Sequence, residues 1–200
     1  MVTVRAQAHT LEAVTAGMIL LASVVFALQV TAVTPLSAST SSQHIENQQQ
    51  SSAVGVLDTA RETGALKAAV VHWDDTNGTL HGVSAGAYTT DAEVNETRLG
   101  RMLLDTFQSR GVAFNVYVTY TGDTGTVARE RFIYRGEPSD NAATATTSLA
   151  LYDDDPLYDA NGTATDTTVN GSSTYGNFVP SGSDTGLYNV VRVEVVVWRM

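Results

Sequence analysis

Hydrophobic residues in this 200-residue chain are concentrated first near the N-terminus, in one run that contains no charged side chain. The run is continuous over residues 13–28, is interrupted by Gln29 and resumes over residues 30–33. Counted over residues 13–33 it holds 21 residues, close to the ~20 that a helix needs to cross a bilayer. Backbone polar groups in lipid must be paired within the segment, so we expect a helix. Pro35 lacks an amide hydrogen and is expected to bend or break it.

The pattern after this run predicts a second helical stretch and then a helix followed by strands. A polar Ser/Thr stretch at residues 37–42 is expected to be a hinge. Residues 42–67 have apolar positions that recur at helical spacing, namely Ile45, Val54, Leu57, Ala60 and Leu66. Residues 65–73 either continue that helix or begin a strand, and residues 74–95 have the composition of a loop.

Residues 96–109 predict a helix with Leu99, Met102, Leu103 and Phe107 on one side, and Gly111 gives a stop signal. Strands are expected at residues 112–120 and 126–135, joined by a turn at 122–125, and again at 145–152. Residues 153–186 are polar and rich in turns. Residues 188–198 form the clearest strand, with one face made of alternate valines and the other carrying Arg192 and Glu194.

This order of elements predicts an α+β protein. We expect a long N-terminal hydrophobic helix, followed by a head domain with one helix and an antiparallel sheet of about four strands. The corresponding segments are a leader at residues 1–7, a transmembrane or filament-core helix at 8–36, an extended helix and hinge at 37–70, and the head domain at 71–200.

Composition narrows the possible functions. The formal net charge is −10, from 21 acidic and 11 basic residues, which argues against binding to nucleic acid or to anionic lipid through a basic patch. Lys67 is the only lysine and the other ten bases are arginines, a pattern that resembles proteins of extreme halophiles. There is no cysteine, which excludes disulfides, thiolate metal sites and cysteine nucleophiles.

The residues before the apolar run leave three interpretations open. A cleaved secretory signal could end at Val30-Thr31-Ala32, where small residues allow cleavage. A permanent N-terminal anchor would also fit the run. The third interpretation, a prepilin-type leader, rests on a single basic residue, Arg5, and on Glu12 at the start of the run, where a secretory signal would avoid an acid.

The segment Arg5-Ala6-Gln7-Ala8-His9-Thr10-Leu11-Glu12 carries a resemblance to the type IV pilin superfamily. In that superfamily a short basic leader, the class III signal, is removed just before a hydrophobic helix that has a glutamate near its fifth residue. Cleavage after Gln7 would make Glu12 the fifth residue, and cleavage after Ala6, which archaeal leaders favour, would make it the sixth. The resemblance covers residues 1–35, and the remainder is similar to haloarchaeal pilin-like proteins of unassigned function.

The resemblance implies a structural subunit of an archaeal type IV pilus or a related surface complex, assembled through the N-terminal helix. Glu12 would pair with the N-terminus of a neighbouring subunit and set the register between them. Glu12 could instead stabilise the start of its own helix, with Thr10 as N-cap. Implied partners are other pilin-like subunits, a prepilin peptidase and assembly machinery. The alternative is a singly anchored extracellular binding domain that does not polymerise.

Catalytic motifs were sought and not found, so we expect no enzyme activity and no cofactor. His72 and His81 are candidates for a metal site, but solvated loop residues are the simpler interpretation. Three consecutive aspartates at residues 153–155 and the stretch to Asn161 raise a calcium hypothesis against a solvated acidic loop. Aromatic residues around the long loop either contact a ligand or subunit or anchor the loop: Tyr152, Tyr158, Tyr175 and Phe178.

Four Asn-X-Ser/Thr sequences follow the apolar run and are candidate glycosylation sites: Asn77, Asn95, Asn161 and Asn170. Their surroundings are typical of turns, which suits surface modification outside the cell. We therefore expect a single-pass membrane protein whose head domain lies at the extracellular cell surface.

Overall fold

The structure is a computed structural model. It describes the backbone of residues 3–81, 88–122, 125–182 and 185–199, and the side chains of these residues except 3–7 and 30–42. Contacts divide the chain into an N-terminal unit, Met1–Ile45, and a head unit, Glu46–Met200.

Helix α1 (Thr3–Glu62) begins in the N-terminal unit and ends in the head unit. The predicted break at Pro35 is wrong, because the backbone is helical before, at and after this residue. Proline removes one intrahelical hydrogen bond, whereas ending the helix there would leave several backbone groups without partners. A hinge at residues 37–42 stays a prediction, although these residues are helical in the structure.

The end of α1 is set by glycine. Gly64 has a φ of 72°, a left-handed conformation that glycine adopts without strain, and it separates α1 from α2 (Ala65–Val70). Strand β1 (Trp73–Asp74) follows at once. The sequence predicted either a helix or the start of a strand for residues 65–73. The structure contains both, a helix to Val70 and then a strand that begins at Trp73.

The last turns of α1 belong to the core of the head unit. Ala53, Val56, Leu57 and Ala60 are buried, so the predicted apolar face is confirmed at Leu57 and Ala60. It is wrong at Val54, which is 42% exposed. The buried positions lie within about 100° of one another around the helix, and Val54, although three residues before Leu57, lies about 60° beyond the edge of that sector.

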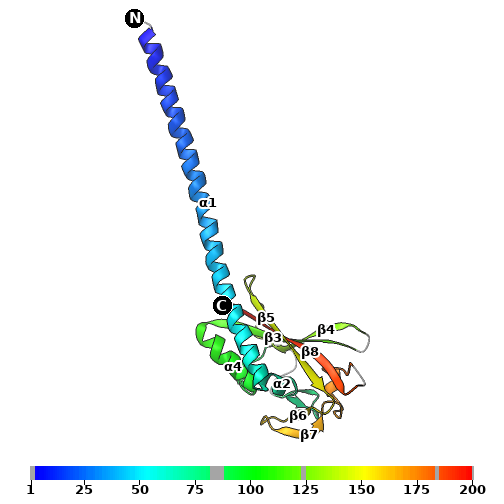
Figure 1. Ribbon diagram of the computed structural model, residues 1–200. Helices are drawn as coiled ribbons and strands as arrows, with labels where there is room; N and C mark the ends of the chain where they lie inside the picture. The colour runs from blue at the N-terminus through cyan, green and yellow to red at the C-terminus, as the bar shows by residue number, and fades with distance from the viewer. Residues whose placement is uncertain (1–2, 82–87, 123–124, 183–184, 200) are drawn as a thin grey trace. The chain divides into compact units, whose positions relative to one another are not determined.

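The main sheet has four antiparallel strands, as predicted, and their order is β4-β3-β8-β5. They are β3 (Val112–Thr121), β4 (Val127–Ile133), β5 (Ala143–Tyr152) and β8 (Leu187–Arg199), with the long β8 next to β3 and β5 (Figure 1). The alternation predicted for the last strand is confirmed, since Val191, Val193, Val195 and Val197 are all fully buried.

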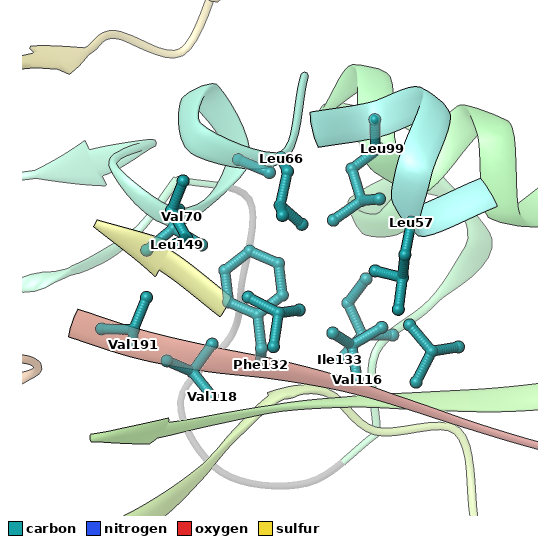
Figure 2. Packing of buried hydrophobic residues seen from close by; sticks show 14 of the residues in the cluster. Leu57, Leu66, Val70, Leu99, Val116, Val118, Phe132, Ile133, Leu149 and Val191 are labelled. Atoms are coloured by element: carbon teal, nitrogen blue, oxygen red, sulfur yellow. The ribbon is translucent and has the colours of Figure 1, made fainter. Parts of the chain in front are cut away.

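Helices cover the valine face of this sheet. Leu57 from α1, Leu66 and Val70 from α2, and Leu99 from α4 (Arg98–Phe107) lie on the helical side of the core. Figure 2 shows them facing side chains of the sheet, which include Val116, Val118, Phe132, Ile133, Leu149 and Val191. The prediction for the middle helix is confirmed: Leu99, Leu103 and Phe107 are buried, and Met102 is partly buried.

Shorter elements lie between these. Strand β2 (Thr79–Leu80) pairs with β1, and β6 (Pro156–Tyr158) pairs with β7 (Ala164–Thr168). A short helix, α3 (Asp91–Val94), precedes α4, and 3₁₀ turns occur at Gln108–Arg110 and Tyr175–Asn177. The segments predicted only as loops, 74–95 and 153–186, therefore contain short hairpins and a helix.

Candidate functional site

Among the residues that the structure describes, one segment of the N-terminal unit is long and apolar enough to cross a membrane, Ala8–Gln29, with a mean hydropathy of 2.2. Signal sequences near an N-terminus meet the same test of length and composition. Ten large apolar side chains between Leu11 and Leu28 are 51–70% exposed. Burying one such side chain is worth about 1.5–3 kcal/mol, so covering all of them is worth on the order of 20 kcal/mol. An exposed apolar surface of this size is typical of segments that lipid or protein covers.

Polar side chains within this segment are suited to such surroundings. The Thr15 hydroxyl donates to the Leu11 carbonyl oxygen at 2.7 Å, and the Ser23 hydroxyl donates to the Ile19 carbonyl oxygen at 2.8 Å. Both hydroxyls are satisfied within their own helix, which lowers the cost of placing them in an apolar medium.

Glu12 is the acid of this segment, and its side chain is 81% exposed. The His9 Nδ1 lies 3.6 Å from the Glu12 carboxylate, one helical turn away. The prediction of Thr10 as N-cap is wrong for the intact chain, because α1 begins at Thr3. Stabilisation by the helix dipole falls off within the first turn, so it acts little on Glu12 unless the preceding residues are removed.

The predicted leader residues lie at the start of α1. The backbone of Arg5, Ala6 and Gln7 is helical, and their side chains are outside the described residues. Ala8 is exposed. Cleavage beside Ala6 or Gln7 stays a prediction.

All four predicted glycosylation sites are exposed in the head unit. Asn95 caps the C-terminus of α3, Asn161 lies between β6 and β7, and Asn170 follows β7. The Asn77 Nδ2, the atom to which a glycan is attached, donates to the Asp74 Oδ2 at 2.6 Å. A glycan at Asn77 would therefore compete with a local hydrogen bond.

The structure brings His72 and His81 together, with ring centroids 4.9 Å apart. His72 is 3% exposed, and burial, followed by the nearby His81, lowers its pKa to about 4. The imidazole of His72 is therefore neutral near pH 7. No group of three or more His, Asp or Glu side chains that could hold a metal ion occurs in the part of the chain that the structure describes.

Two carboxylates of the acidic loop, those of Asp155 and Asp159, have protein partners, whereas the Asp153 Oδ1 is buried without one among the described residues. Both oxygens of Asp155 accept hydrogen bonds from the Lys67 Nζ at 2.7 Å, and Asp159 accepts from the backbone amides of Asn161 and Thr163. The ammonium of Lys67 supplies the positive charge that a calcium ion would bring to Asp155.

Two of the four aromatic side chains, Tyr175 and Phe178, anchor the long loop as one of the two interpretations predicted, whereas Tyr152 is 47% exposed. Trp73 stacks on Phe178 with centroids 5.4 Å apart and meets Tyr175 edge-on at 5.5 Å. Asp75 reinforces this contact by accepting hydrogen bonds from Thr174 and Ser172. These hydroxyls lower its pKa to about 2.

A cleft of about 370 Å³ lies in the head unit, between residues 63–72, the N-terminus of α4 and the β6–β7 turn. We call it the arginine cleft, since Arg98 and Arg101 line it. Neither arginine was among the site residues predicted from the sequence. One signal was present: bases in the first turn of a helix oppose the helix dipole, so Arg98 and Arg101 stand where acids are usual.

Comparisons with known proteins identify a family and leave its function open. No curated protein and no solved structure matches the chain. The model of a family of unknown function, DUF7288, matches residues 5–197, which include most of both units. The chain therefore belongs to the family of unknown function DUF7288.

Proposed function

We propose that this protein is a pilin-like structural subunit of an archaeal type IV filament or a related cell-surface complex. Its helix Ala8–Gln29 would reside in the membrane before assembly and pack against the helices of other subunits afterwards. The observation that supports this most is the combination of an exposed apolar helix with one acid near its start, Glu12.

The physical role proposed for Glu12 is to select one register between subunits. A carboxylate in an apolar bundle is costly unless it is paired, and the amino terminus of a cleaved neighbouring helix carries the required charge. Among the described residues, the recorded ion pair of Glu12 is with His9, and both side chains are more than 80% exposed. A stronger partner from another subunit can therefore reach it.

The family match favours a function that uses both units. One family model extends from residue 5 to residue 197 and so includes the apolar helix as well as the head unit. An acidic head unit without cysteine, with four exposed sequons, suits an extracellular position in which glycosylation and high salt are tolerated.

The first test is mass spectrometry of the protein isolated from its own membranes. The proposal expects a mature N-terminus at Gln7 or Ala8. An N-terminus at Val33 would contradict the proposal and indicate a secreted protein whose signal is cleaved. An intact N-terminus would favour a simple anchor. Glycopeptides from the same digest would report which sequons are modified.

The second test exchanges two neighbouring residues, so that composition and hydropathy stay constant. The double variant Leu11→Glu/Glu12→Leu moves the acid by one position, which rotates it by about 100° around the helix axis. We expect membrane insertion to persist and surface assembly, measured by cross-linking and by recovery of sheared filaments, to be lost. Glu62→Ala, which removes an exposed acid at the other end of α1, is the control. Unchanged assembly in the double variant would eliminate the register role.

A second candidate function is a singly anchored binding domain that does not polymerise. The arginine cleft in the head unit favours it, because a 370 Å³ cleft is large enough for a small ligand. Cross-linking in native membranes separates the two candidates: ladders of subunits support assembly, and an exclusively monomeric species supports the anchored domain.

A further inference from the structure

The walls of the arginine cleft come from three segments that are distant in sequence. Thr63 and Ala68 contribute from the region that joins α1 to α2, Arg98 and Arg101 from the first turns of α4, and Tyr158 from β6. All of these residues belong to the head unit. The volume of about 370 Å³ lies within the range of small-molecule sites.

The charge of the cleft differs from that of the whole chain. Its charged lining residues are Arg98, Arg101 and Glu96, so the lining carries +1, whereas the chain carries −10. Arg101 donates to the backbone carbonyl oxygens of Asn95 and Glu96, at 2.8 and 3.2 Å. Arg98 has no hydrogen-bond or ion-pair partner within the described part of the chain and is exposed. Its guanidinium is therefore available to a ligand.

The position of Arg98 on α4 strengthens the local positive potential. Thr97 is the N-cap, and its hydroxyl accepts from the Gly100 amide at 2.9 Å. The N-terminus of this ten-residue helix carries partial positive charge, which disfavours an arginine and favours an anion. Two arginines in the first four positions are therefore an unfavourable arrangement unless an anion lies against them.

A second observation, independent of the helix, comes from His72. It lines the arginine cleft and also a smaller cavity of about 10 Å³ that it shares with His81. The His72 Nε2 is buried and has no hydrogen-bond partner among the described residues. Buried polar atoms in folded proteins are almost always partnered, and His72 lines both cavities, so its unpartnered Nε2 indicates a hydrogen-bonding group on the side of one or the other.

We propose that the arginine cleft binds a small ligand that carries an oxyanion, such as a carboxylate or a phosphate group. Arg98 and the N-terminus of α4 bind the oxyanion, because a guanidinium and free helix amides both donate to such oxygens. Tyr158 and the alanine wall that includes Ala68 contact the body of the ligand. The proposal does not depend on filament assembly, since it concerns the head unit alone.

The test measures binding of two defined probes, sodium glucuronate and inorganic phosphate, to the full-length chain in detergent by isothermal titration calorimetry. Production in bacteria avoids a glycan at Asn161, which also lines the cleft. We expect saturable binding with a Kd of about 1 mM for at least one probe, and glucose, the neutral counterpart of glucuronate, to bind at least about tenfold more weakly.

The decisive variant is Arg98→Gln, which removes the charge of an exposed side chain that has no described partner. It is expected to weaken binding at least about tenfold, while Arg110→Gln, an exposed arginine at the other end of the same helical region, changes it less than about twofold. Any one of three results would overturn the proposal. These are equal binding by the two variants, equal binding of glucose and glucuronate, and no saturable binding of either anion. An unchanged thermal unfolding midpoint in Arg98→Gln verifies that the fold is intact.

Discussion

Replacement of Leu57 by alanine tests whether the last turns of α1 are part of the core of the head unit. Leu57 is 1% exposed and packs among residues of the helices and the sheet (Figure 2). The substitution removes three carbon atoms, worth about 0.8 kcal/mol each, and leaves a cavity that adds to this loss. We expect the free energy of unfolding to fall by about 3 kcal/mol, within the 2–5 kcal/mol range of such substitutions.

Val54→Ala is the matched control from the same helix. The sequence pattern placed Val54 and Leu57 on one face, but Val54 is 42% exposed. Its truncation removes less buried surface, and alanine favours a helix more than valine by about 0.5 kcal/mol. We therefore expect a change of about 0.5 kcal/mol or less in the free energy of unfolding.

The assay is thermal unfolding of the full-length protein in detergent, followed by tryptophan fluorescence. Trp73 and Trp198 are both buried in the head unit, so the signal reports on that unit. At about 2–4 °C for each kcal/mol, Leu57→Ala should lower Tm by about 6–12 °C, and Val54→Ala by about 2 °C or less. The salt concentration is kept high and constant, because salt screens the repulsion among the acidic side chains on the surface. Equal shifts for the two variants would refute the described packing of α1 in the head unit.

Three further predictions concern the head unit. Gly100→Ala should destabilise it by about 1–3 kcal/mol in urea unfolding, although alanine normally favours a helix, because a Cβ there would overlap the Val94 carbonyl oxygen. Lys67→Met should cost about 1–3 kcal/mol, since it leaves the largely buried Asp155 without its cation, and the double variant with Asp155→Asn should recover part of this loss. The pKa of Asp75 is lowered from 3.8 to about 2, so its contribution to stability is complete above the unfolded value and is lost as pH falls from about 4 to 2. Asp75→Asn should flatten the dependence of Tm on pH in that interval, as measured by the same fluorescence assay.

Elements that depend on local periodicity could be predicted from the sequence. The helix around Leu103 and the strand around Val195 have apolar residues at spacings that only one type of element explains, and each is buried as expected. The hairpin of β3 and β4 could be predicted because two strand-like segments flank a turn that contains Gly122 and Gly125. The pattern did not show that β3 is buried on both faces, where Ala113, Tyr117, Val196 and Trp198 form a second cluster opposite the valines.

Short elements could not be predicted in the same way. Strands β1 and β2 have two residues each, too few for a period, and β6 and β7 pair with an irregular register. Helix α3 was predicted as part of a loop, although the sequence contains a signal for its start: Thr90-Asp-Ala-Glu93 is a capping box, in which the Glu93 carboxylate accepts from the Thr90 amide at 2.6 Å.

The arginine cleft could not be predicted from the sequence for a different reason. Its walls combine residues near 65, 98 and 158, and no local pattern shows that these segments meet. The same holds for the Lys67–Asp155 pair, which joins residues 88 positions apart. The sequence raised a calcium hypothesis for the acidic loop, and nothing local in it shows that Lys67 reaches Asp155.

On the proposed function, the apolar side chains of the N-terminal helix cannot decide between membrane and filament. Lipid tails are as apolar as leucine, so moving Leu20 or Phe26 from lipid into a helix bundle changes little hydrophobic free energy. The Thr15 and Ser23 hydroxyls also keep their intrahelical partners in both media. Glu12 is different, because its carboxylate is costly in lipid and becomes favourable only beside a positive charge. If the protein assembles as proposed, Glu12 is therefore the side chain of this helix that we expect to distinguish one register between subunits from another.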